Sequence, residues 1–259
     1  MLSENSKFAT LCEEVGIKFI GPSAKVMDTM GDKINARAEM IRAQVPVIPG
    51  SDGEVYTSEE ALAIADKIGY PVMLKASAGG GGKGIRKVER AEDLVTAFEN
   101  ASSEAQAAFG NGAMYMERVI YPARHIEVQI LADQHGHVIH LGERDCSLQR
   151  NNQKVLEEAP SIAIGHTLRN KIGEAAVRAA ASVGYENAGT IEFLLDEAKG
   201  EFYFMEMNTR VQVEHPVTEF VTGVDIVKEQ IQIAAGQVLE KSQEEVQIKG
   251  HAIECRINA

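Results

Sequence analysis

The clearest pattern along the chain is a recurrence of apolar residues at helical spacing. Between Ala24 and Gln44 an apolar side chain returns every three or four positions, which is the period of an amphipathic helix. Thr57 and Glu60 form the sequence of a capping box, and Gly69 suits the end of the helix that they begin. Helices are therefore expected at residues 6–15, 24–44, 57–68, 91–109, 168–183 and 225–235.

Short apolar runs and strict alternation predict strands between these helices. Residues 126–130 alternate apolar and polar side chains, as a strand with one buried face should. Residues 138–141 are the expected hairpin partner, across a polar turn at 133–137. Further strands are expected at residues 70–76, 85–88, 113–117, 190–195, 201–208 and 251–257.

The order of these elements indicates a mixed α+β fold with a mainly antiparallel sheet rather than a doubly wound parallel one. A helical start precedes a small αβ unit, and an antiparallel sheet with helices follows. Composition changes near Pro46 and near Pro122. Three pieces are expected, at residues 1–46, 47–120 and 121–259.

Composition narrows the class of protein. The 259 residues are 44% hydrophobic and 25% charged, an ordinary globular balance, and the net charge of −12 argues against a nucleic-acid binder. No apolar run reaches the ~18 residues of a membrane helix, and three scattered cysteines fit a reducing compartment, so a cytoplasmic protein is expected. The chain starts almost directly in a helical pattern and stops inside an expected strand, so a fragment is expected.

The most visible local feature is a glycine run, Gly79-Gly80-Gly81-Gly82-Lys83-Gly84, between two expected strands. Glycine lets the backbone approach a phosphate closely. A Walker A loop requires Ser or Thr after the lysine, and a Rossmann turn requires a helix after the glycines; this sequence has Gly84 and an expected strand instead. A protein kinase would also require HRD and DFG sequences, which the chain lacks. The alternative is a flexible hairpin without function. Lys75, on the entering strand, favours phosphate binding.

A second feature is a set of polar residues in apolar strands. Glu206 and Asn208 are two apart in a run that otherwise reads as a buried strand, so they share a face. A tight turn pairs this run with the strand that carries Glu192. Two carboxylates and an amide oxygen suit Mg²⁺ or Mn²⁺ held against phosphates. The alternative is a set of structural, salt-bridged acids.

The even positions continue this polar face. If the chain stays extended beyond Asn208, then Arg210, Gln212 and Glu214 point to the same side. Arg210 offers a fork for a planar oxyanion, Gln212 adds a donor, and Glu214 is a candidate general base. The alternative for Arg210 is a neutralising partner of Glu206.

These residues together resemble the ATP-grasp core of biotin carboxylases, most closely the biotin carboxylase subunits of bacterial acetyl-CoA carboxylases. The resemblance covers essentially the whole chain. It is carried by Lys75, Glu192 and four further segments: Met30-Gly31-Asp32-Lys33, Gly142-Glu143-Arg144-Asp145-Cys146-Ser147-Leu148-Gln149-Arg150 with Gln153-Lys154-Val155, Glu206-Met207-Asn208-Thr209-Arg210-Val211-Gln212-Val213-Glu214-His215-Pro216, and Glu254-Cys255-Arg256-Ile257-Asn258-Ala259.

The resemblance implies an ATP-grasp fold, in which two α+β subdomains grip ATP. Residues 1–46 would be the remnant of an N-terminal domain with a linking helix, 47–120 the lid subdomain with the glycine flap, and 121–259 an incomplete C-terminal subdomain with a mainly antiparallel sheet. Contacts to ATP are implied for Lys33, Lys75, Gly79, Gly80, Gly81, Gly82, Gly84, Glu117, Val119, Ile120, His125, Gln149 and Asn152. Many family members carry histidine where Asn152 stands, so an altered nucleotide affinity is expected.

The implied reaction is the ATP- and bicarbonate-dependent carboxylation of biotin on a carrier protein through carboxyphosphate, the first half-reaction of acetyl-CoA carboxylase in fatty acid biosynthesis. Mg²⁺ or Mn²⁺ would bind Glu192, Glu206 and Asn208. Bicarbonate would bind Arg210, Gln212 and the Val213 amide, and Glu214 would deprotonate it. Lys154 would neutralise phosphoryl charge, and Arg256 would stabilise the biotin enolate.

The resemblance also implies partners, namely a biotin carboxyl carrier protein, a carboxyltransferase component and, at full length, a second copy in a homodimer. No nucleic acid and no membrane are expected. The alternatives are the same core of a pyruvate or propionyl-CoA carboxylase, another ATP-grasp ligase, or a non-catalytic nucleotide-binding module. Because both ends look cut, this chain is expected to bind nucleotide and to turn over slowly or not at all.

Overall fold

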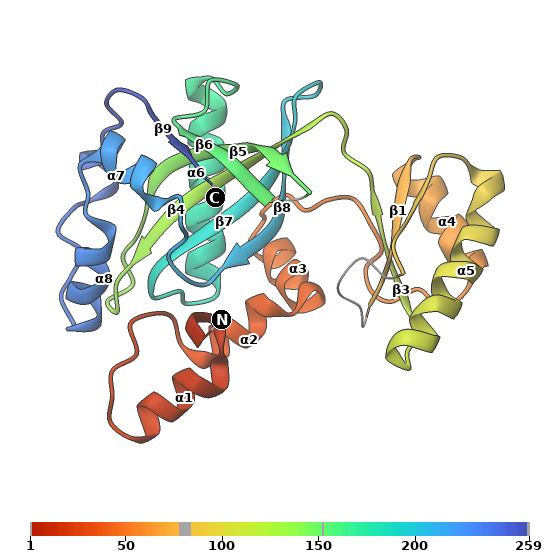
Figure 1. Cartoon of the computed structure of the whole chain (residues 1–259), viewed down its shortest axis with the longest axis horizontal. Coiled ribbons are helices and arrows are strands. Elements are labelled where there is room, and N and C mark those ends of the chain that lie inside the picture. The colour runs from red at the N-terminus through yellow and green to blue at the C-terminus, as the bar shows by residue number, and fades with distance from the viewer. Residues whose placement is uncertain (1, 78–83, 152, 258–259) are drawn as a thin grey trace. The chain divides into compact units, whose positions relative to one another are not determined.

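The structure, a computed structural model, describes residues 2–77, 84–151 and 153–257 (Figure 1). Its elements divide into two compact units. The larger comprises residues 1–47 and 122–259, and the smaller comprises residues 48–121. The first residues therefore group with the larger unit, and their origin in a separate preceding domain stays a prediction.

The larger unit is built on a six-stranded sheet in the order β8-β7-β4-β5-β6-β9, with every neighbouring pair antiparallel. This confirms the expected α+β class with an antiparallel sheet. The strands are β4 (Ala123–Ala132), β5 (Val138–Arg150), β6 (Gln153–Ala159), β7 (Asn187–Asp196), β8 (Glu201–Asn208) and β9 (Ala252–Cys255). The helical elements of this unit are η1 (Leu2–Glu4), α1 (Ser6–Glu14), α2 (Ala24–Gly31), α3 (Lys33–Arg42), α6 (His166–Ser182), α7 (His215–Thr222), α8 (Ile226–Ala234) and η2 (Gln243–Glu245).

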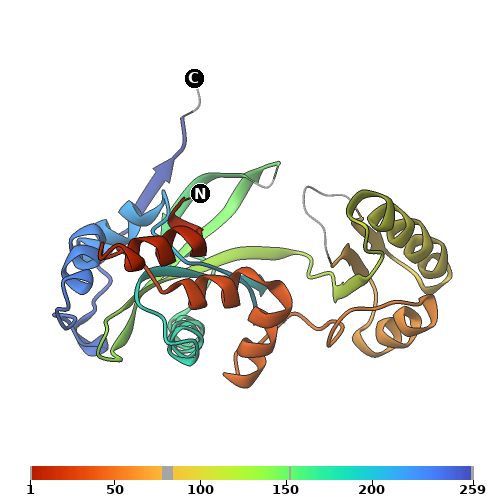
Figure 2. The ribbon, with the colours of Figure 1, turned by 90° about the horizontal axis from the view of Figure 1, so that it is seen from below.

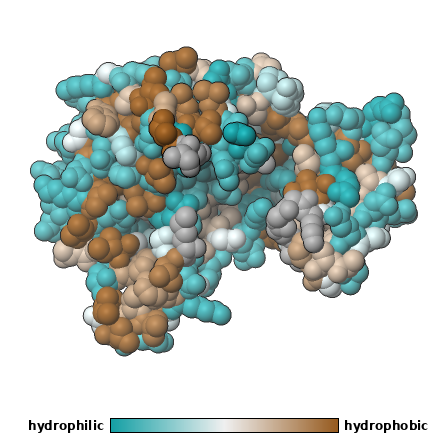
Figure 3. Space-filling model, in the orientation of Figure 1, coloured by the Kyte–Doolittle hydropathy of each residue, from teal (hydrophilic) through white to brown (hydrophobic). Residues whose placement is uncertain are grey.

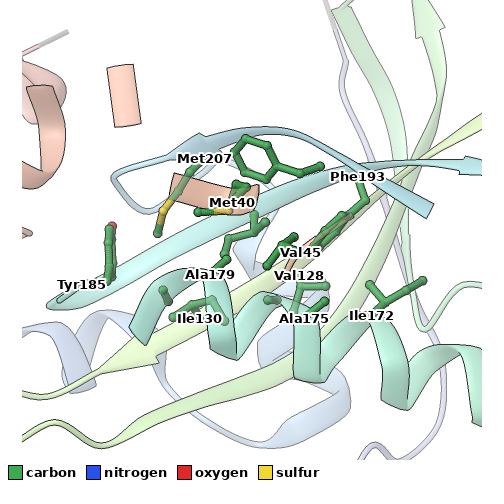
Figure 4. Close-up of a cluster of buried hydrophobic side chains, with 14 of the residues drawn as sticks. Met40, Val45, Val128, Ile130, Ile172, Ala175, Ala179, Tyr185, Phe193 and Met207 are labelled. Carbon is green, nitrogen blue, oxygen red and sulfur yellow. The ribbon is translucent and has the colours of Figure 1, made fainter. Parts of the chain in front are cut away.

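One face of this sheet is apolar and is covered by α6, which lies beneath the strands in Figure 2. Alternate residues of β4, from Ile126 to Ala132, join apolar residues of β7 and an alanine-rich face of α6 in a single core. Figure 4 shows how Ile172, Ala175 and Ala179 of α6 meet Val128 and Ile130 of β4. Small alanine side chains let the helix lie close to the sheet.

β4 is buried on its opposite face as well, which corrects the expectation of a half-buried strand. Its intervening residues Glu127, Gln129 and Leu131 are at most 1% exposed. At one end, Leu131 packs with Ile226 and Ile233 of α8. The alternation in the sequence predicts a water-facing polar face, whereas Glu127 and Gln129 are covered by the protein and both accept hydrogen bonds from Arg144.

The smaller unit is a three-stranded antiparallel sheet in the order β2-β1-β3 with two helices. Its elements are α4 (Ser58–Ile68), β1 (Val72–Ala76), β2 (Arg86–Val88), α5 (Ala91–Phe109) and β3 (Met114–Arg118). Leu74 and Met116 of the sheet pack with Leu94 and Phe98 of α5. The Thr57–Glu60 capping box at the start of α4 is present, as predicted.

Three further expectations about the elements were wrong. The helix expected at 24–44 is two helices, because Asp32 accepts hydrogen bonds from the N–H groups of Ile34 and Asn35 and so caps a new helix. The strand expected at 138–141 runs on to Arg150 as β5, and β6 was missed. The chain does not stay extended from Asn208 to Glu214, because β8 ends at Asn208 and α7 begins at His215.

The surface carries apolar side chains over α1, visible as a brown area in Figure 3, among them Phe8, Leu11 and Val15. Within the described residues, no helix combines the length and the hydrophobicity needed to cross a membrane.

Candidate functional site

A row of four charged residues crosses the larger sheet in register. Arg144 of β5 lies opposite Glu127 of β4, which lies opposite Glu192 of β7, and Glu192 lies opposite Glu206 of β8. Directly opposed residues of an antiparallel sheet point to the same face. The sheet therefore aligns one guanidinium and three carboxylates. The predicted pairing of Glu192 with Glu206 is confirmed.

Lys154 of β6 joins this row. Its ammonium group lies 2.9 Å from Glu192 Oε1 and 2.6 Å from Glu214 Oε1, and it also pairs with Glu127. Burial alone would lower the pKa of Lys154, but the charges of Glu127 and Glu192 outweigh it and raise that pKa. Lys154 is therefore a firmly charged centre shared by three carboxylates.

Glu192 is the most heavily bonded acid of the row. Its Oε1 accepts hydrogen bonds from Lys154, from Asn208 Nδ2 at 2.9 Å and from Gln212 Nε2 at 3.1 Å. Its Oε2 lies 2.9 Å from His125 Nε2. Burial opposes ionisation, but His125 and Lys154 outweigh it and lower the pKa of Glu192 to about 2. Glu192 is thus a fixed negative charge at neutral pH.

Glu206 differs from the rest of the row. It is exposed, which corrects the expectation of a fully buried strand, and among the described residues its carboxylate makes no hydrogen bond or ion pair. Partial burial and the neighbouring charge of Glu192 raise the pKa of Glu206. Two adjacent carboxylates with one of them unpaired form an uncompensated negative position, which a cation would stabilise.

The donors at this position fit a hard divalent cation, since Glu192, Glu206 and Asn208 offer only oxygen ligands. Among the described residues, two other groups gather possible ligand atoms within 4.8 Å of one another: His125, Glu127 and Glu192, and Glu127, Cys146 and Glu214. Lys154 pairs with Glu127 in both groups, which disfavours a cation there. The assignment of the metal to Glu192, Glu206 and Asn208 stays a prediction.

Although the chain turns after β8, the residues predicted for anion binding still gather at this site. Gln212 is buried and donates to Glu192. Arg210 donates from Nε to Glu4 Oε2 at 2.8 Å and from Nη2 to Asn208 Oδ1 at 3.4 Å. The fork of Arg210 therefore already holds one carboxylate, and Glu206 is not its recorded partner.

Glu214 occupies the N-cap position of α7 and is buried. Its two oxygens have different cationic partners. Lys154 approaches Oε1, and Arg256 Nη2 donates to Oε2 at 2.9 Å. Arg256 is held in turn by Glu157, which accepts from its Nε at 2.7 Å. The end of β9 is thereby tied to the start of α7.

These side chains surround a cavity of about 1060 Å³ in the larger unit. Its walls include the residues predicted for metal, anion and general base, together with Lys154 and Arg256. His125 and Gln149, predicted beside the ribose, also line it and contact each other, with Gln149 Nε2 3.0 Å from His125 Nδ1. The residues predicted in this unit that line the cavity are Glu192, Glu206, Asn208, Arg210, Gln212, Val213, Glu214, Lys154, Arg256, His125 and Gln149. Lys33, also predicted in this unit, does not line it.

Other predicted nucleotide-binding residues lie in the smaller unit. Lys75 of β1 and Glu117 of β3 form an ion pair on one face of the small sheet. Gly84 has a φ of 69°, and a Cβ there would lie 2.8 Å from that of Ala76, so this position requires glycine. Val119 donates its N–H to Pro71 O at 2.8 Å, so this N–H already has a partner.

Lys33 and Ile120 are the other predicted positions that the structure describes. Ile120 follows Val119 in the smaller unit. Lys33 is exposed at the start of α3, and its charge reaches Glu206. Gly79, Gly80, Gly81, Gly82 and Asn152 lie outside the described residues.

Comparison with known proteins identifies the family. Residues 32–242 match the model of the family described as "Carbamoyl-phosphate synthase L chain, ATP binding domain". The chain belongs to this family. Residues 1–27 match the model of a second family, described as "Biotin carboxylase, N-terminal domain".

Within the family, the chain resembles biotin carboxylases along its whole length. It is 59% identical over 258 residues to a biotin carboxylase of Nostoc sp. and spans 58% of that protein. The Campylobacter jejuni biotin carboxylase, solved as a β-γ-ATP complex, superposes with a TM-score of 0.88 at 54% identity, over 98% of this chain and 57% of the other.

A third relative is the biotin carboxylase domain of Hydrogenobacter thermophilus 2-oxoglutarate carboxylase. It was solved as a dimer with MgADP, ADP and bicarbonate, and it superposes with a TM-score of 0.88 at 58% identity, over 100% of this chain and 57% of that one. The α+β ATP-grasp fold expected from the sequence is confirmed. The chain spans somewhat more than half the length of these relatives.

Two charged residues of the site, Glu127 and Arg144, were not among the site residues predicted from the sequence. Both are completely buried and paired, with Arg144 Nε donating to Glu127 Oε1 at 2.6 Å. The available signal was weak, because both residues lie in strands that carry several other polar side chains. Because Glu127 fitted an alternating pattern, it was interpreted as facing water.

Proposed function

We propose that this chain is the ATP- and bicarbonate-binding part of a biotin carboxylase, an ATP-dependent ligase. One observation carries the proposal: the buried carboxylate of Glu214 lies between Lys154 and Arg256, in a cavity that also holds the Glu192, Glu206 and Asn208 oxygens. A base between two cations suits a reaction in which one anion attacks another. The similarity to biotin carboxylases along the whole chain supports this choice.

In the proposed reaction, Arg210, Gln212 and the Val213 amide bind bicarbonate and Glu214 removes its proton. A bicarbonate oxygen then forms a bond to the γ-phosphorus of ATP as the bond to ADP breaks, which gives carboxyphosphate. Lys154 lies within 2.6 Å of Glu214 and stabilises the negative charge that gathers between the two anions. Positioning and charge stabilisation supply most of the rate.

Carboxyphosphate then breaks down to CO₂ and phosphate. We propose that the phosphate takes the N1 proton of biotin and that Arg256 stabilises the resulting enolate, whose carbon dioxide adduct is carboxybiotin. Arg256 suits this role because its guanidinium is fixed by both Glu157 and Glu214. A guanidinium held on two sides loses little further freedom when it binds an oxyanion.

The nucleotide contacts are proposed for two groups of residues. In the larger unit, Glu192, Glu206 and Asn208 would hold Mg²⁺ or Mn²⁺, which when bound neutralises phosphate charge. His125 and Gln149 would meet the ribose. In the smaller unit, Lys75, Glu117 and the backbone around Val119 and Ile120 would meet the phosphates and the adenine. Lys33 and the glycine run 79–84 complete the proposed set.

Glu206→Gln is expected to remove the Mg²⁺ dependence of nucleotide binding. A neutral amide cannot replace the unpaired carboxylate as a cation ligand, and a loss of about 10- to 100-fold in MgADP affinity is expected. Calorimetric titration of the chain with ADP, with and without Mg²⁺, measures it. Glu201→Gln, on the same strand, is the control, because Glu201 accepts from Tyr203 Oη at 2.5 Å and does not line the cavity. Equal MgADP affinity in both variants would refute the metal assignment.

The proposed activity is tested by ATP hydrolysis with and without bicarbonate and free biotin, in the full-length protein that contains this chain. A biotin carboxylase should cleave ATP faster when both are added. In a carbamoyl-phosphate synthetase or an amino-acid ligase, the rate of ATP hydrolysis would not depend on biotin. In a nucleotide-binding module without catalysis, it would depend on neither compound. A rate of ATP hydrolysis that changes with neither bicarbonate nor biotin would refute the proposal.

The acceptor that receives the carboxyl group from biotin is a finer question. We propose acetyl-CoA, from the resemblance to the subunits of bacterial acetyl-CoA carboxylases. Biotin carboxylase domains that serve other acceptors are equally similar to this chain, since that of a 2-oxoglutarate carboxylase is 58% identical. Reconstitution with a biotinylated carrier and a carboxyltransferase, supplied with acetyl-CoA, propionyl-CoA or pyruvate, distinguishes these acceptors. A homodimer is part of the same proposal for the full-length protein.

A further inference from the structure

Arg144 is a completely buried arginine at the centre of the larger sheet, and its guanidinium does not reach the cavity. Each of its five N–H groups has an acceptor among the described residues. These acceptors are Glu127 Oε1 at 2.6 Å, Gln129 Oε1 at 2.8 Å, Thr218 Oγ1 at 3.0 Å, Thr190 Oγ1 at 3.1 Å and Gln212 Oε1 at 3.2 Å. A guanidinium has five donors and no acceptor, so every bond that it can make is made here.

The bond to Gln212 determines which way round that amide lies. Arginine can only donate, so the oxygen of the Gln212 amide must face Arg144. The amide nitrogen is then directed to the other side, where it donates to Glu192 Oε1 at 3.1 Å at the wall of the cavity. Glu192 can only accept and favours the same orientation, so loss of Arg144 removes one of the two groups that fix this amide. An amide oxygen facing the cavity would repel an anion.

The bond to Thr218 fixes a second part of the site. Thr218 belongs to the first turns of α7, and Glu214 is the N-cap residue of the same helix, four positions earlier. Arg144 therefore connects the central strand β5 to the helix that begins at the proposed base. One side chain determines the placement of both the amide donor and the carboxylate.

We propose that Arg144 is a positioning residue for bicarbonate, acting through the Gln212 amide and through α7. This role rests on the proposed function and concerns how the bicarbonate-binding groups of that site are held in place. Arg144 itself touches neither substrate. Its five fixed bonds hold an N–H donor and a carboxylate at the distance and orientation that the anion requires.

A purely structural role is the competing explanation, and Arg169 provides the comparison. Arg169 also pairs with a buried acid, since its Nε donates to Glu143 Oε1 at 2.8 Å. Its other recorded bonds go to the carbonyls of Ser161 and Ile164, and it does not line the cavity. Arg169→Lys thus removes a similar set of bonds without touching Gln212 or α7.

The test compares Arg144→Lys with Arg169→Lys in the full-length protein. Lysine keeps the positive charge but cannot reach five acceptors. Arg144→Lys should raise the KM for bicarbonate by about tenfold, the effect of one misplaced hydrogen bond, while the Kd for MgADP stays within about twofold. Arg169→Lys should leave the KM for bicarbonate unchanged. An unchanged KM in Arg144→Lys, or an equal rise in both variants, overturns the inference.

A double-mutant cycle identifies the route of the effect. In a Gln212→Met background, Arg144→Lys should add less than about a twofold further rise in the KM for bicarbonate, because the amide that it orients is gone. A full tenfold rise in that background would show that Arg144 does not act through Gln212. If Arg144→Lys does not fold, Thr218→Val deletes one acceptor with little change of shape and should raise the KM about threefold. An unchanged KM in that variant refutes the link through α7.

These outcomes are separable from failure of the proposed function. If the unmodified protein shows no bicarbonate-stimulated ATP cleavage, the proposed function itself is wrong. If the stimulation is present and Arg144→Lys retains the same KM for bicarbonate, only the positioning role is wrong.

Discussion

Glu214→Gln is expected to reduce bicarbonate-stimulated ATP cleavage by about 10²- to 10⁴-fold, the usual contribution of a general base. The amide preserves the size of the side chain, and its oxygen can still accept from either Lys154 or Arg256. It cannot take a proton from bicarbonate. The affinity for MgADP should stay unchanged, since Glu214 is not among the proposed metal ligands. Steady-state kinetics of the full-length protein and calorimetry of this chain supply the two measurements.

Glu219→Gln is a matched control on the same helix. Glu219 accepts from the N–H of Ile226 at 2.7 Å, which joins α7 to α8, and it does not line the cavity. It should lower stability slightly and leave the bicarbonate response intact. A Glu214→Gln protein that keeps more than about a tenth of the stimulated rate would show that another group removes the proton.

Lys154→Met is expected to lower the free energy of unfolding by about 3–5 kcal/mol at pH 7.5, because it leaves Glu127, Glu192 and Glu214 without their shared cation. The raised pKa of Lys154 means that its contribution is complete below its ordinary value of 10.5 and is lost only above the raised one. Urea denaturation of this chain at several pH values measures the effect.

The pH dependence of that loss has a definite sign. The lowered pKa of Glu192, about 2, makes its contribution complete above the ordinary value of 4.5 and lost as the pH falls toward 2. Without Lys154 the buried carboxylates hold protons more tightly, so the variant should recover part of its deficit as the pH is lowered from 7.5 toward 4.5. A deficit that is constant over this range would indicate lost packing rather than lost charge.

Lys18→Met provides the comparison for an exposed pair. Lys18 lies 3.1 Å from Glu186, and its side chain is 52% exposed. Solvent screens such a pair, so its removal should cost less than about 1 kcal/mol at any of these pH values.

Several parts of the site could be predicted because they follow from local rules. The turn between β7 and β8 is short, so the two strands must pair, and Glu192 and Glu206 meet in the observed register. The period of the apolar residues located α5 and α6 to within a few residues. The motif around Glu214 contains an anion fork, an amide donor and a carboxylate at close spacing, which indicates an anion site with a general base. Its assignment to bicarbonate follows from the family resemblance and stays a prediction.

Other parts depend on contacts between distant segments. Extending the strand pattern past Asn208 was wrong, and Gln212 and Glu214 reach the site because α7 packs beside β5 and β6. The interpretation of Glu127 as water-facing failed because α7 and the Arg144 side chain cover that face. No local pattern distinguishes a polar face in water from one that is covered by a helix almost a hundred residues later.

The row from Arg144 to Glu206 exists only when four strands have paired, and two of these, β4 and β8, are far apart in the sequence. The β7–β8 hairpin alone brings Glu192 and Glu206 together, but Lys154, which holds the Glu192 carboxylate, lies on β6 and joins them only when the wider sheet has formed. Mg²⁺-dependent nucleotide binding is therefore a reporter of the native state: during refolding it should appear together with the last strand pairing, and a variant that slips β8 by one residue would fold around a site that cannot bind.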